Sequence, residues 1–268
     1  MKSVIKRNNV KVKGNGKQPM LFAHGFGCDQ HMWRLVSPSF EKDYQVILFD
    51  HVGGGHSDLS AYEPEKYSRL EGYADDIVEI VRELQLTDVI FVGHSVAAMM
   101  GIMAAHKAPE LFSKLVLVGP SPFYINDGDY QGGFSRTQIE ELLESLDNNH
   151  LGWSMAMASV IMGNPDRPEL GQELAESFCS TDPVIAKQFA RTTFLTDTRE
   201  VLSSIKTAAL ILQCSNDIIA PTSVGEYVHA QLAGSEIVYM KATGHCPNLS
   251  APEETILAIK NYLGNTSE

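Results

Sequence analysis

The sequence predicts an α/β fold with a mostly parallel, doubly wound sheet that is interrupted by a lid of four helices. Two observations support this prediction. Short apolar segments rich in β-branched residues alternate with amphipathic helical segments, and this alternation stops near residue 122 and resumes near residue 209. A chain of 268 residues, 44% of them hydrophobic, can build one α/β domain with an insertion and a substantial core.

Four segments in the first part of the chain are predicted to be central strands. Each is almost entirely apolar, as expected for parallel strands whose two faces are both buried. A helix predicted over residues 73–84 places its apolar side chains on one stripe and leads into the third of these strands. Strand–helix–strand units of this kind imply right-handed crossovers and helices on both faces of the sheet. The four strand segments are 20–23, 46–49, 89–92 and 115–118.

Residues 135–194 contain no strand-like segment and are predicted to form four helices. Ser135 and Gln138 have the spacing of a capping box, which predicts the start of the first helix. The second helix is unusually apolar. Pro183 has the place of a first helical residue and predicts the start of the fourth.

The alternation of strand and helix resumes after the insertion. Two further strands are predicted at residues 209–213 and 237–240, and a closing helix at residues 253–263. The chain is therefore expected to divide into an α/β core, residues 1–122 and 196–268, and a helical lid, residues 123–195.

The charge of the chain excludes several classes of partner. The formal net charge is −12, and Lys and Arg form no cluster. Nucleic acids and anionic lipids are bound mainly through basic patches, so neither is an expected partner. The longest apolar run, residues 96–105, is half of the about 20 residues that cross a bilayer, and the N-terminus lacks the apolar segment of a secretory signal. We therefore expect a cytoplasmic protein that acts on small molecules or proteins.

The sequence has no pattern of a metal or cofactor site. The four cysteines are far apart and form no Cys-x-x-Cys pair, which argues against a zinc site or a disulfide framework and favours a reducing compartment. The glycine-rich segment 50–58 lacks the spacing of a dinucleotide-binding loop, and no third ligand is spaced to join His51 and His56. No cofactor and no metal are therefore expected.

The segment around Ser95 has the pattern of a nucleophile. Residues 89–97 read Val-Ile-Phe-Val-Gly-His-Ser-Val-Ala and lead directly into a helix of small residues. A serine on such a sharp strand-to-helix turn exposes its hydroxyl beside the first amides of the helix. The tight turn needs small residues two positions before and after the serine, and Gly93 and Ala97 meet this need. The alternative is an ordinary turn in which Ser95 caps the helix.

Two further residues complete the pattern of a catalytic triad. A serine nucleophile needs a base that accepts its proton and a carboxylate that orients the base. Asp217 follows the strand at 209–213 and His245 follows the strand at 237–240, so both are expected at the same edge of the sheet as Ser95. Taken alone, each could be an ordinary loop residue. Together with Ser95 they give nucleophile, acid and histidine in the chain order of an α/β enzyme.

The turn at residues 24–27, His-Gly-Phe-Gly, follows the first predicted strand and is a candidate oxyanion hole. It can present the amide of Phe26 to a developing oxyanion, with the amide of Val96 as the second donor. The alternative is a tight turn without a catalytic role.

The lid is expected to lie over Ser95 and to enclose an apolar pocket together with Phe26. Such a pocket suits a small uncharged ligand. The same side chains would also suit packing within the lid, so both interpretations stay open. The predicted lining residues are Tyr124, Phe134, Leu142, Trp153, Met157, Phe194, Ile218 and Ile219.

These motifs resemble the α/β-hydrolases of the RsbQ and karrikin/strigolactone-receptor group. The resemblance implies the α/β-hydrolase fold, with Ser95 as nucleophile, Asp217 as acid and His245 as base, and it assigns the oxyanion donors to Phe26 and Val96. His24 and Ala97 differ from the residues typical of RsbQ-like sequences and favour the receptor-like branch, and Met157 stands where plant receptors tend to have an aromatic residue. The resemblance covers essentially the whole chain, and its most specific segments are 9–14, 24–30, 93–96, 130–134, 178–183 and 244–247.

The resemblance also implies a function. It indicates a serine hydrolase that acts on a small hydrophobic ester or a butenolide-like lactone. RsbQ-like proteins act with a partner phosphatase in the bacterial sigma-B stress response, which implies a signalling role and a regulatory phosphatase as a candidate partner. The alternative is a ligand sensor whose triad mainly binds a butenolide-like molecule. A third hypothesis is related chemistry on the same scaffold, such as peracid formation or hydrolysis of a C–C bond.

Overall fold

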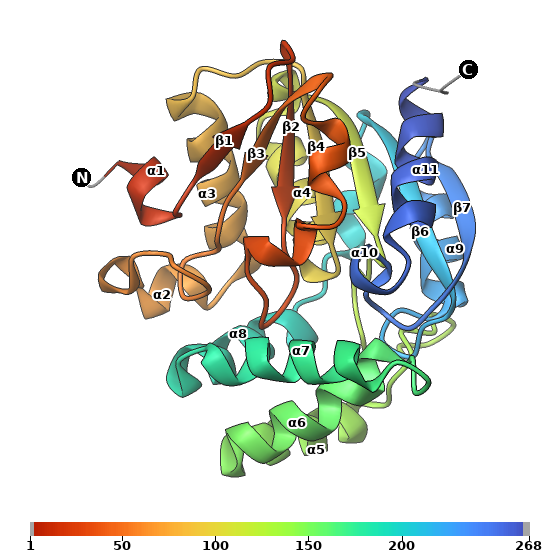
Figure 1. Cartoon of the computed structure of the whole chain (residues 1–268). Coiled ribbons are helices and arrows are strands. Elements are labelled where there is room, and N and C mark those ends of the chain that lie inside the picture. The colour runs from red at the N-terminus through yellow and green to blue at the C-terminus, as the bar shows by residue number, and fades with distance from the viewer. Residues whose placement is uncertain (1–2, 265–268) are drawn as a thin grey trace.

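The computed structural model describes residues 3–264 and has a seven-stranded sheet with helices on both faces (Figure 1). The strand order is β1-β3-β2-β4-β5-β6-β7; β1 pairs antiparallel with β3, and all other neighbouring strands are parallel. This confirms the mostly parallel, doubly wound sheet. The strands are β1 (Lys11–Lys13), β2 (Gln18–Ala23), β3 (Tyr44–Leu48), β4 (Val89–His94), β5 (Phe112–Val118), β6 (Ala208–Asn216) and β7 (Glu236–Thr243).

Alternating side chains of the central strands point into two separate cores. In β4, Ile90 and Val92 join one buried cluster, whereas Val89 and Phe91 join the other. The cluster around Val89 and Phe91 includes residues of α3 (Leu70–Glu83), α4 (Val96–Lys107) and α9 (Thr222–Gln231). The other includes Trp33 and, from α11 (Pro252–Leu263), Ile259. Both faces of the sheet are therefore covered, which explains why its strands are apolar throughout.

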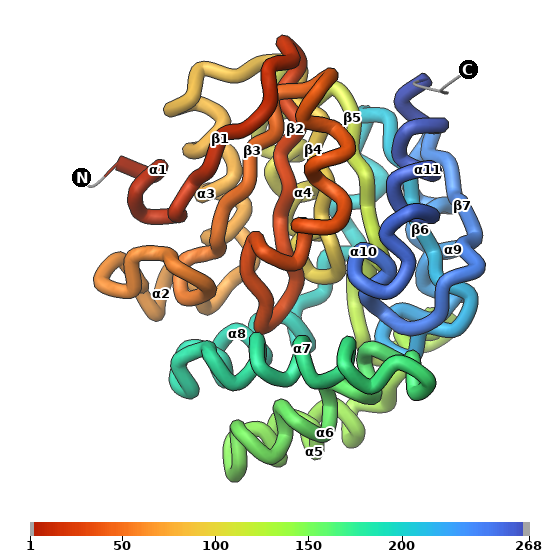
Figure 2. Tube along the Cα trace, viewed as in Figure 1, coloured from red at the N-terminus to blue at the C-terminus, as the bar shows by residue number. Residues whose placement is uncertain are grey.

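The predicted lid helices lie between β5 and β6. Ser135 and Gln138 form the expected capping box, and Asp182 caps the fourth helix, which begins at Pro183. In Figure 1 these helices, green to teal, cross the end of the sheet at which the parallel strands finish. Figure 2 shows the chain leaving the sheet after β5 and returning to it at β6 only after passing through them. They are α5 (Arg136–Asn148), α6 (His150–Met162), α7 (Pro168–Ser180) and α8 (Pro183–Leu195).

The structure adds elements that the sequence pattern did not indicate. β1 consists of Lys-Val-Lys, and all three residues are exposed, so the segment has no apolar run that could reveal it. Its register is set only by pairing with β3. The added short helices are α1 (Val4–Arg7), α2 (Pro64–Tyr67) and α10 (Pro247–Ser250). Within residues 3–264, every helix is too short or too polar to cross a membrane.

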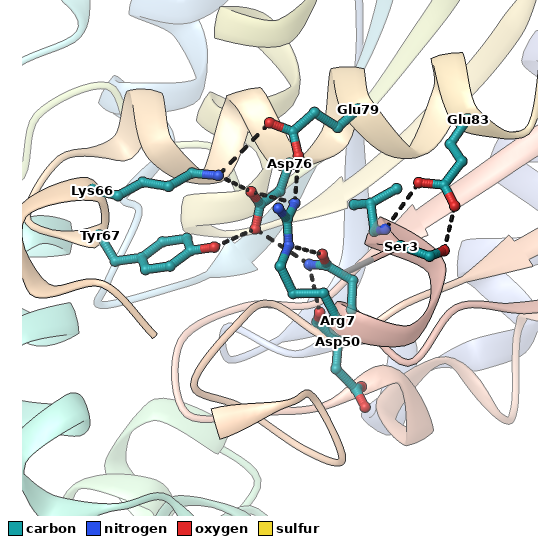
Figure 3. A network of polar contacts seen from close by, with 10 residues as sticks. Ser3, Arg7, Asp50, Lys66, Tyr67, Asp76, Glu79 and Glu83 are labelled. Atoms are coloured by element: carbon teal, nitrogen blue, oxygen red, sulfur yellow. Dashed lines mark hydrogen bonds and ion pairs between the residues drawn. The ribbon is translucent and has the colours of Figure 1, made fainter. Parts of the chain in front are cut away.

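A polar network ties the N-terminal segment to the core (Figure 3). Asp76 of α3 is fully buried, and its carboxylate accepts hydrogen bonds from Arg7 (2.7 Å), Lys66 (2.6 Å) and the Tyr67 hydroxyl (2.9 Å). Glu79 forms a second ion pair with Arg7 at 2.7 Å. The network therefore fixes α1 and α2 against α3.

Candidate active site

Ser95 lies on the sharp turn between β4 and α4. Its backbone has φ 58° and ψ −127°, a conformation that is strained for a residue with a side chain by about 1–3 kcal/mol. The Ser95 N–H donates a hydrogen bond to the carbonyl of Val118 at 2.8 Å, which fixes the turn to the neighbouring strand β5. Strain of this kind is typical of a nucleophile held above the end of a sheet.

The structure brings Ser95, His245 and Asp217 together. Nε2 of His245 lies 2.7 Å from Oγ of Ser95, and Nδ1 of His245 lies 2.7 Å from Oδ2 of Asp217. All three residues are buried. Because a carboxylate only accepts, Nδ1 donates to Asp217, and Nε2 then accepts from the Ser95 hydroxyl. This is the arrangement in which a histidine can take a proton from a serine.

The second oxygen of Asp217 is fixed by the backbone. Oδ1 accepts hydrogen bonds from the amides of Ile219 (2.8 Å) and Ala220 (3.0 Å). These bonds hold the carboxylate in one orientation after the end of β6. The loop itself therefore aims Oδ2 at His245.

The loop that holds His245 is fixed by α6 and by β4. The His245 N–H donates to the carbonyl of Ile161 in α6 at 2.9 Å. The His245 carbonyl accepts a hydrogen bond from Nε2 of His94 at 2.7 Å. Burial, together with the nearby His245, lowers the pKa of His94 to about 3. His94 is therefore a neutral structural donor at the site.

The candidate oxyanion turn passes directly against Ser95. A Cβ atom on Gly25 would lie 3.3 Å from Cβ of Ser95 and 2.7 Å from Nδ1 of His94, so only glycine fits there. Gly27 has φ +65°, and a Cβ there would lie 2.4 Å from the Phe178 ring. Phe26 lies between these two glycines, and Val96 begins α4 immediately after Ser95. Both predicted donors thus belong to segments that adjoin the serine.

Two neutral histidines support this turn. Nδ1 of His24 donates to the Gly25 carbonyl at 3.0 Å, and Nε2 of His24 accepts from the His51 N–H at 3.0 Å. Nε2 of His51 donates back to the His24 carbonyl at 2.9 Å. Burial lowers the pKa of both rings, which keeps them uncharged. His51 is thus held by hydrogen bonds through both its backbone N–H and its ring.

A cavity of about 30 Å³ adjoins Ser95 and His245; it is called here the Ser95 cavity. Of the predicted lining residues, Tyr124, Phe194 and Ile219 line it, and Phe26 does as well. The other five do not line this cavity. Phe134, Leu142 and Met157 are half-buried against the core, Trp153 lines a separate cavity, and Ile218 is 45% exposed.

Several lining residues were not predicted. Leu174 and Phe178 lie four positions apart on α7, a spacing that places them on one helix face and could have revealed them. Thr193 precedes the predicted Phe194 on α8. Within the described residues 3–264, the hydroxyl of Thr193 is buried without a hydrogen-bond partner. The remaining unpredicted lining residues are Cys28, His94, Ile161 and Cys246.

The two cysteines in the Ser95 cavity are not activated thiols. Burial raises the pKa of Cys28 to about 12 and that of Cys246 well above its ordinary value. A thiol with a raised pKa stays protonated and is a poor nucleophile. In the part of the chain that the structure describes, no group of three His, Cys, Asp or Glu side chains is arranged to bind a metal ion.

Comparison with known proteins finds similarity to alpha/beta hydrolases and to plant receptors and esterases. The model of the alpha/beta hydrolase family matches residues 20–258. The karrikin insensitive 2 receptor CA of Petunia hybrida is 37% identical over 261 residues, which cover 97% of each chain. A strigolactone esterase of Arabidopsis thaliana is 37% identical over 262 residues, which cover 97% of this chain and 98% of the esterase.

Among solved structures, a hydrolase from Oleispira antarctica has a TM-score of 0.95 and 40% identity. The match covers 98% of this chain and 97% of that hydrolase. Both the sheet and the helices inserted between β5 and β6 therefore have counterparts in a known hydrolase structure.

Proposed function

The chain belongs to the alpha/beta hydrolase family, and we propose that it is a serine hydrolase that cleaves a small hydrophobic ester or lactone. Ser95 is the proposed nucleophile, His245 the base and Asp217 the residue that orients the base. The observation that supports this proposal most directly is the pair of 2.7 Å contacts that link Asp217, His245 and Ser95 in series.

In the first half of the proposed reaction, Oγ of Ser95 attacks the carbonyl carbon of the ester while Nε2 of His245 takes the serine proton. Asp217 stabilises the positive charge that forms on the imidazole. The amides of Phe26 and Val96 donate to the oxyanion, and each such donor contributes about 2.7–4 kcal/mol to stabilising the transition state. The intermediate collapses when the bond to the alcohol oxygen breaks and His245 returns its proton to that oxygen.

In the second half, water hydrolyses the acyl-serine. Nε2 of His245 takes a proton from the water as its oxygen attacks the acyl carbon. The bond to Oγ of Ser95 then breaks, and His245 returns the proton to Oγ. The products are a carboxylic acid and free Ser95; from a lactone the acid and the alcohol are parts of one molecule.

We assign residues 123–195 to a lid domain and residues 1–122 and 196–268 to the core. The Ser95 cavity of about 30 Å³ is far smaller than the roughly 300 Å³ of ordinary ligand pockets. Binding of an ester therefore requires residues that line the cavity to move apart. The lining is mostly apolar, which supports an uncharged ligand. The four cysteines are unpaired, and we assign the protein to the reducing cytoplasm.

The test is hydrolysis of p-nitrophenyl acetate by the wild type and by Ser95→Ala. The variant is expected to lose about 10⁴- to 10⁶-fold in kcat. Treatment with a sulfonyl fluoride, followed by intact mass measurement, should add one sulfonyl group to the wild type and none to the variant. Equal rates for the two proteins would refute the proposal.

A ligand sensor is the second candidate function. It is supported by relatives that are named receptors as well as by relatives named esterases. In this case the chain would bind a butenolide-like molecule and change its contacts with a protein partner, such as a regulatory phosphatase of a sigma-B stress response. The choice of a phosphatase as the candidate partner depends on the resemblance to RsbQ-like proteins.

Hydrolysis and sensing give different results in one experiment. Wild type and Ser95→Ala are each incubated with a butenolide, and both the melting temperature and the capture of a candidate phosphatase are measured. A sensor that does not need turnover is expected to respond equally in the two proteins. A response confined to the wild type would favour an enzyme whose products or acyl-serine act as the signal.

A further inference from the structure

The turn between α6 and α7, residues 163–167, packs against the loop that carries His245, residues 244–249. They are called here the α6–α7 turn and the His245 loop. Gly163 has φ +62° and Gly244 has φ +78°. A Cβ atom on Gly163 would lie 2.9 Å from Cα of Gly244, and one on Gly244 would overlap the carbonyl oxygen of the last residue of α6. The two glycines therefore allow the two backbones to lie in direct contact.

Two polar side chains of the α6–α7 turn donate hydrogen bonds to the ends of the His245 loop. Nδ2 of Asn164 donates to the carbonyl of Thr243, the last residue of β7, at 3.1 Å. Nη1 of Arg167 donates to the carbonyl of Ser250, the last residue of α10, at 2.8 Å. Hydrogen bonds from a charged guanidinium are about twice as strong as those between neutral groups. The loop is thus held on both sides of His245.

Asn164 and Arg167 also fix each other. Nη2 of Arg167 donates to Oδ1 of Asn164 at 2.7 Å, and the Arg167 N–H donates to the Asn164 carbonyl at 3.0 Å. Nδ2 of Asn164 donates in addition to the Met162 carbonyl at 2.7 Å. Because each side chain is already ordered by these bonds, its bond to the His245 loop costs little additional conformational entropy.

The same region of the chain contacts the His245 backbone directly. The Ile161 carbonyl in α6 accepts a hydrogen bond from the His245 N–H at 2.9 Å. Ile161 also lines the Ser95 cavity, whereas none of the described residues 163–167 does. The α6–α7 turn therefore does not contact the reacting groups. Its two bonds lie on either side of the Ile161 contact and oppose movement of His245 away from Ser95.

We infer that Asn164 and Arg167 are positioning residues that keep the ring of His245 in contact with Ser95 and Asp217. The triad depends on two contacts of 2.7 Å, and a displacement of about 1 Å can lower a rate by about 10²-fold. This inference rests on the proposed hydrolysis at Ser95. It assigns to the inserted helices a part in placing the catalytic base, in addition to their part in lining the Ser95 cavity.

The test compares hydrolysis of p-nitrophenyl acetate by the wild type, Arg167→Ala, Arg167→Lys and Arg191→Ala. Arg191 is the matched control, because its ion pair with Asp147 joins two inserted helices, α8 and α5, to each other. Lysine at position 167 can replace one of the two side-chain hydrogen bonds that Arg167 donates. The folded fraction is measured by thermal unfolding, and kcat is expressed per folded molecule.

In Arg167→Ala, kcat is expected to fall by about 10- to 100-fold while KM stays within about twofold, because His245 loses its position whereas the cavity keeps its lining. Arg167→Lys should lose less than Arg167→Ala. Arg191→Ala should keep kcat within about twofold of the wild type, since exposed ion pairs contribute little. Equal kcat per folded molecule in Arg167→Ala and Arg191→Ala would overturn the inference. Should Arg167→Ala not fold, Asn164→Ala takes its place with the same expected loss.

Hydrogen exchange separates this inference from the proposed function. Amide exchange is measured by mass spectrometry in a peptide that covers residues 243–250 and in one that covers residues 217–221. In Arg167→Ala, exchange in 243–250 is expected to be about 3- to 10-fold faster than in the wild type, with exchange in 217–221 unchanged. Arg191→Ala should match the wild type in both peptides.

Faster exchange confined to residues 243–250 would support the hold on His245 even if the wild type hydrolyses no ester. Unchanged exchange there would overturn the inference even if Ser95→Ala abolishes hydrolysis and so supports the enzyme.

Discussion

Two buried aspartates, Asp76 and Asp217, have opposite surroundings. Asp76 is fully buried and contacts two cations, Arg7 at 2.7 Å and Lys66 at 2.6 Å. Asp217 is 5% exposed, and its described partners are two backbone amides and the ring of His245. Burial raises the pKa of Asp76 although both cations favour its charged form.

The comparison teaches what a buried carboxylate can do. The charge of Asp76 is already balanced by permanent cations, so it can only hold segments together. The charge of Asp217 faces a histidine that gains positive charge when it accepts a proton from Ser95, so its stabilising effect grows during the proposed reaction. We therefore expect the first carboxylate to contribute to stability and the second to the proposed reaction.

The largest expected effect is on activity at Asp217. Asp217→Asn should lower kcat for p-nitrophenyl acetate by about 10⁴-fold, because an amide no longer holds the His245 proton on Nδ1. The melting temperature should change little, since the amide oxygen can still accept from the backbone. A loss of less than tenfold in kcat would contradict the role proposed for Asp217.

The next effect is on stability at Asp76. Asp76→Ala should lower the free energy of unfolding by about 3–5 kcal/mol, because it leaves Arg7 and Lys66 without their buried partner. Urea unfolding measures this loss. The kcat of the folded fraction should stay within about threefold of wild type. If activity per folded molecule fell as much as in Asp217→Asn, the division between the two aspartates would be wrong.

Low pH should destabilise the folded protein through His94, the residue before Ser95. Its pKa is about 3 in the folded protein and about 6.5 when unfolded, so the unfolded chain binds more protons between these values. The free energy of unfolding should therefore fall as pH decreases from 6.5 towards 3, by up to about 1.4 kcal/mol per pH unit from this residue. Above pH 6.5 the effect vanishes. His94→Asn should show a smaller acid slope in urea unfolding, and an unchanged slope would contradict the assignment.

The smallest effect is expected at the residue next to Asp76. Asp75 forms an ion pair with Lys107 in which both side chains are largely exposed. Asp75→Ala should change the free energy of unfolding by less than about 1 kcal/mol, because water screens such pairs. This variant is the matched control for Asp76→Ala. A loss as large as that at Asp76 would show that burial does not explain the difference.

Some of the site could be predicted because it depends on local pattern. The apolar runs that end before Asp217 and His245 identify parallel strands, and such strands end at one edge of a sheet. The small residues around Ser95 indicate a sharp turn, and this prediction needs no knowledge of tertiary contacts. These residues were therefore placed near one another from sequence alone, and their catalytic roles stay proposals for the experiments above.

The pocket could not be predicted to the same extent. Leu142 and Met157 are as apolar as Leu174, yet only Leu174 lines the Ser95 cavity. The rotation and tilt of each inserted helix determine which of its faces lies toward Ser95. Packing between the helices sets this rotation and tilt. Sequence periodicity predicts which residues form the apolar side of a helix, but not which part of the protein that side packs against.

The sequence by itself determined the order of the central parallel strands and the longer helices along the chain, the break in their alternation, and the position of each candidate catalytic residue at a strand end. These features follow from short-range hydrophobic and turn patterns. Only the tertiary structure decided that Asp76 faces cations and Asp217 a histidine, and that Leu174 rather than Leu142 lines the Ser95 cavity. The physical reason is that charge balance and hydrogen bonding depend on distances of a few ångströms between groups that are remote along the chain.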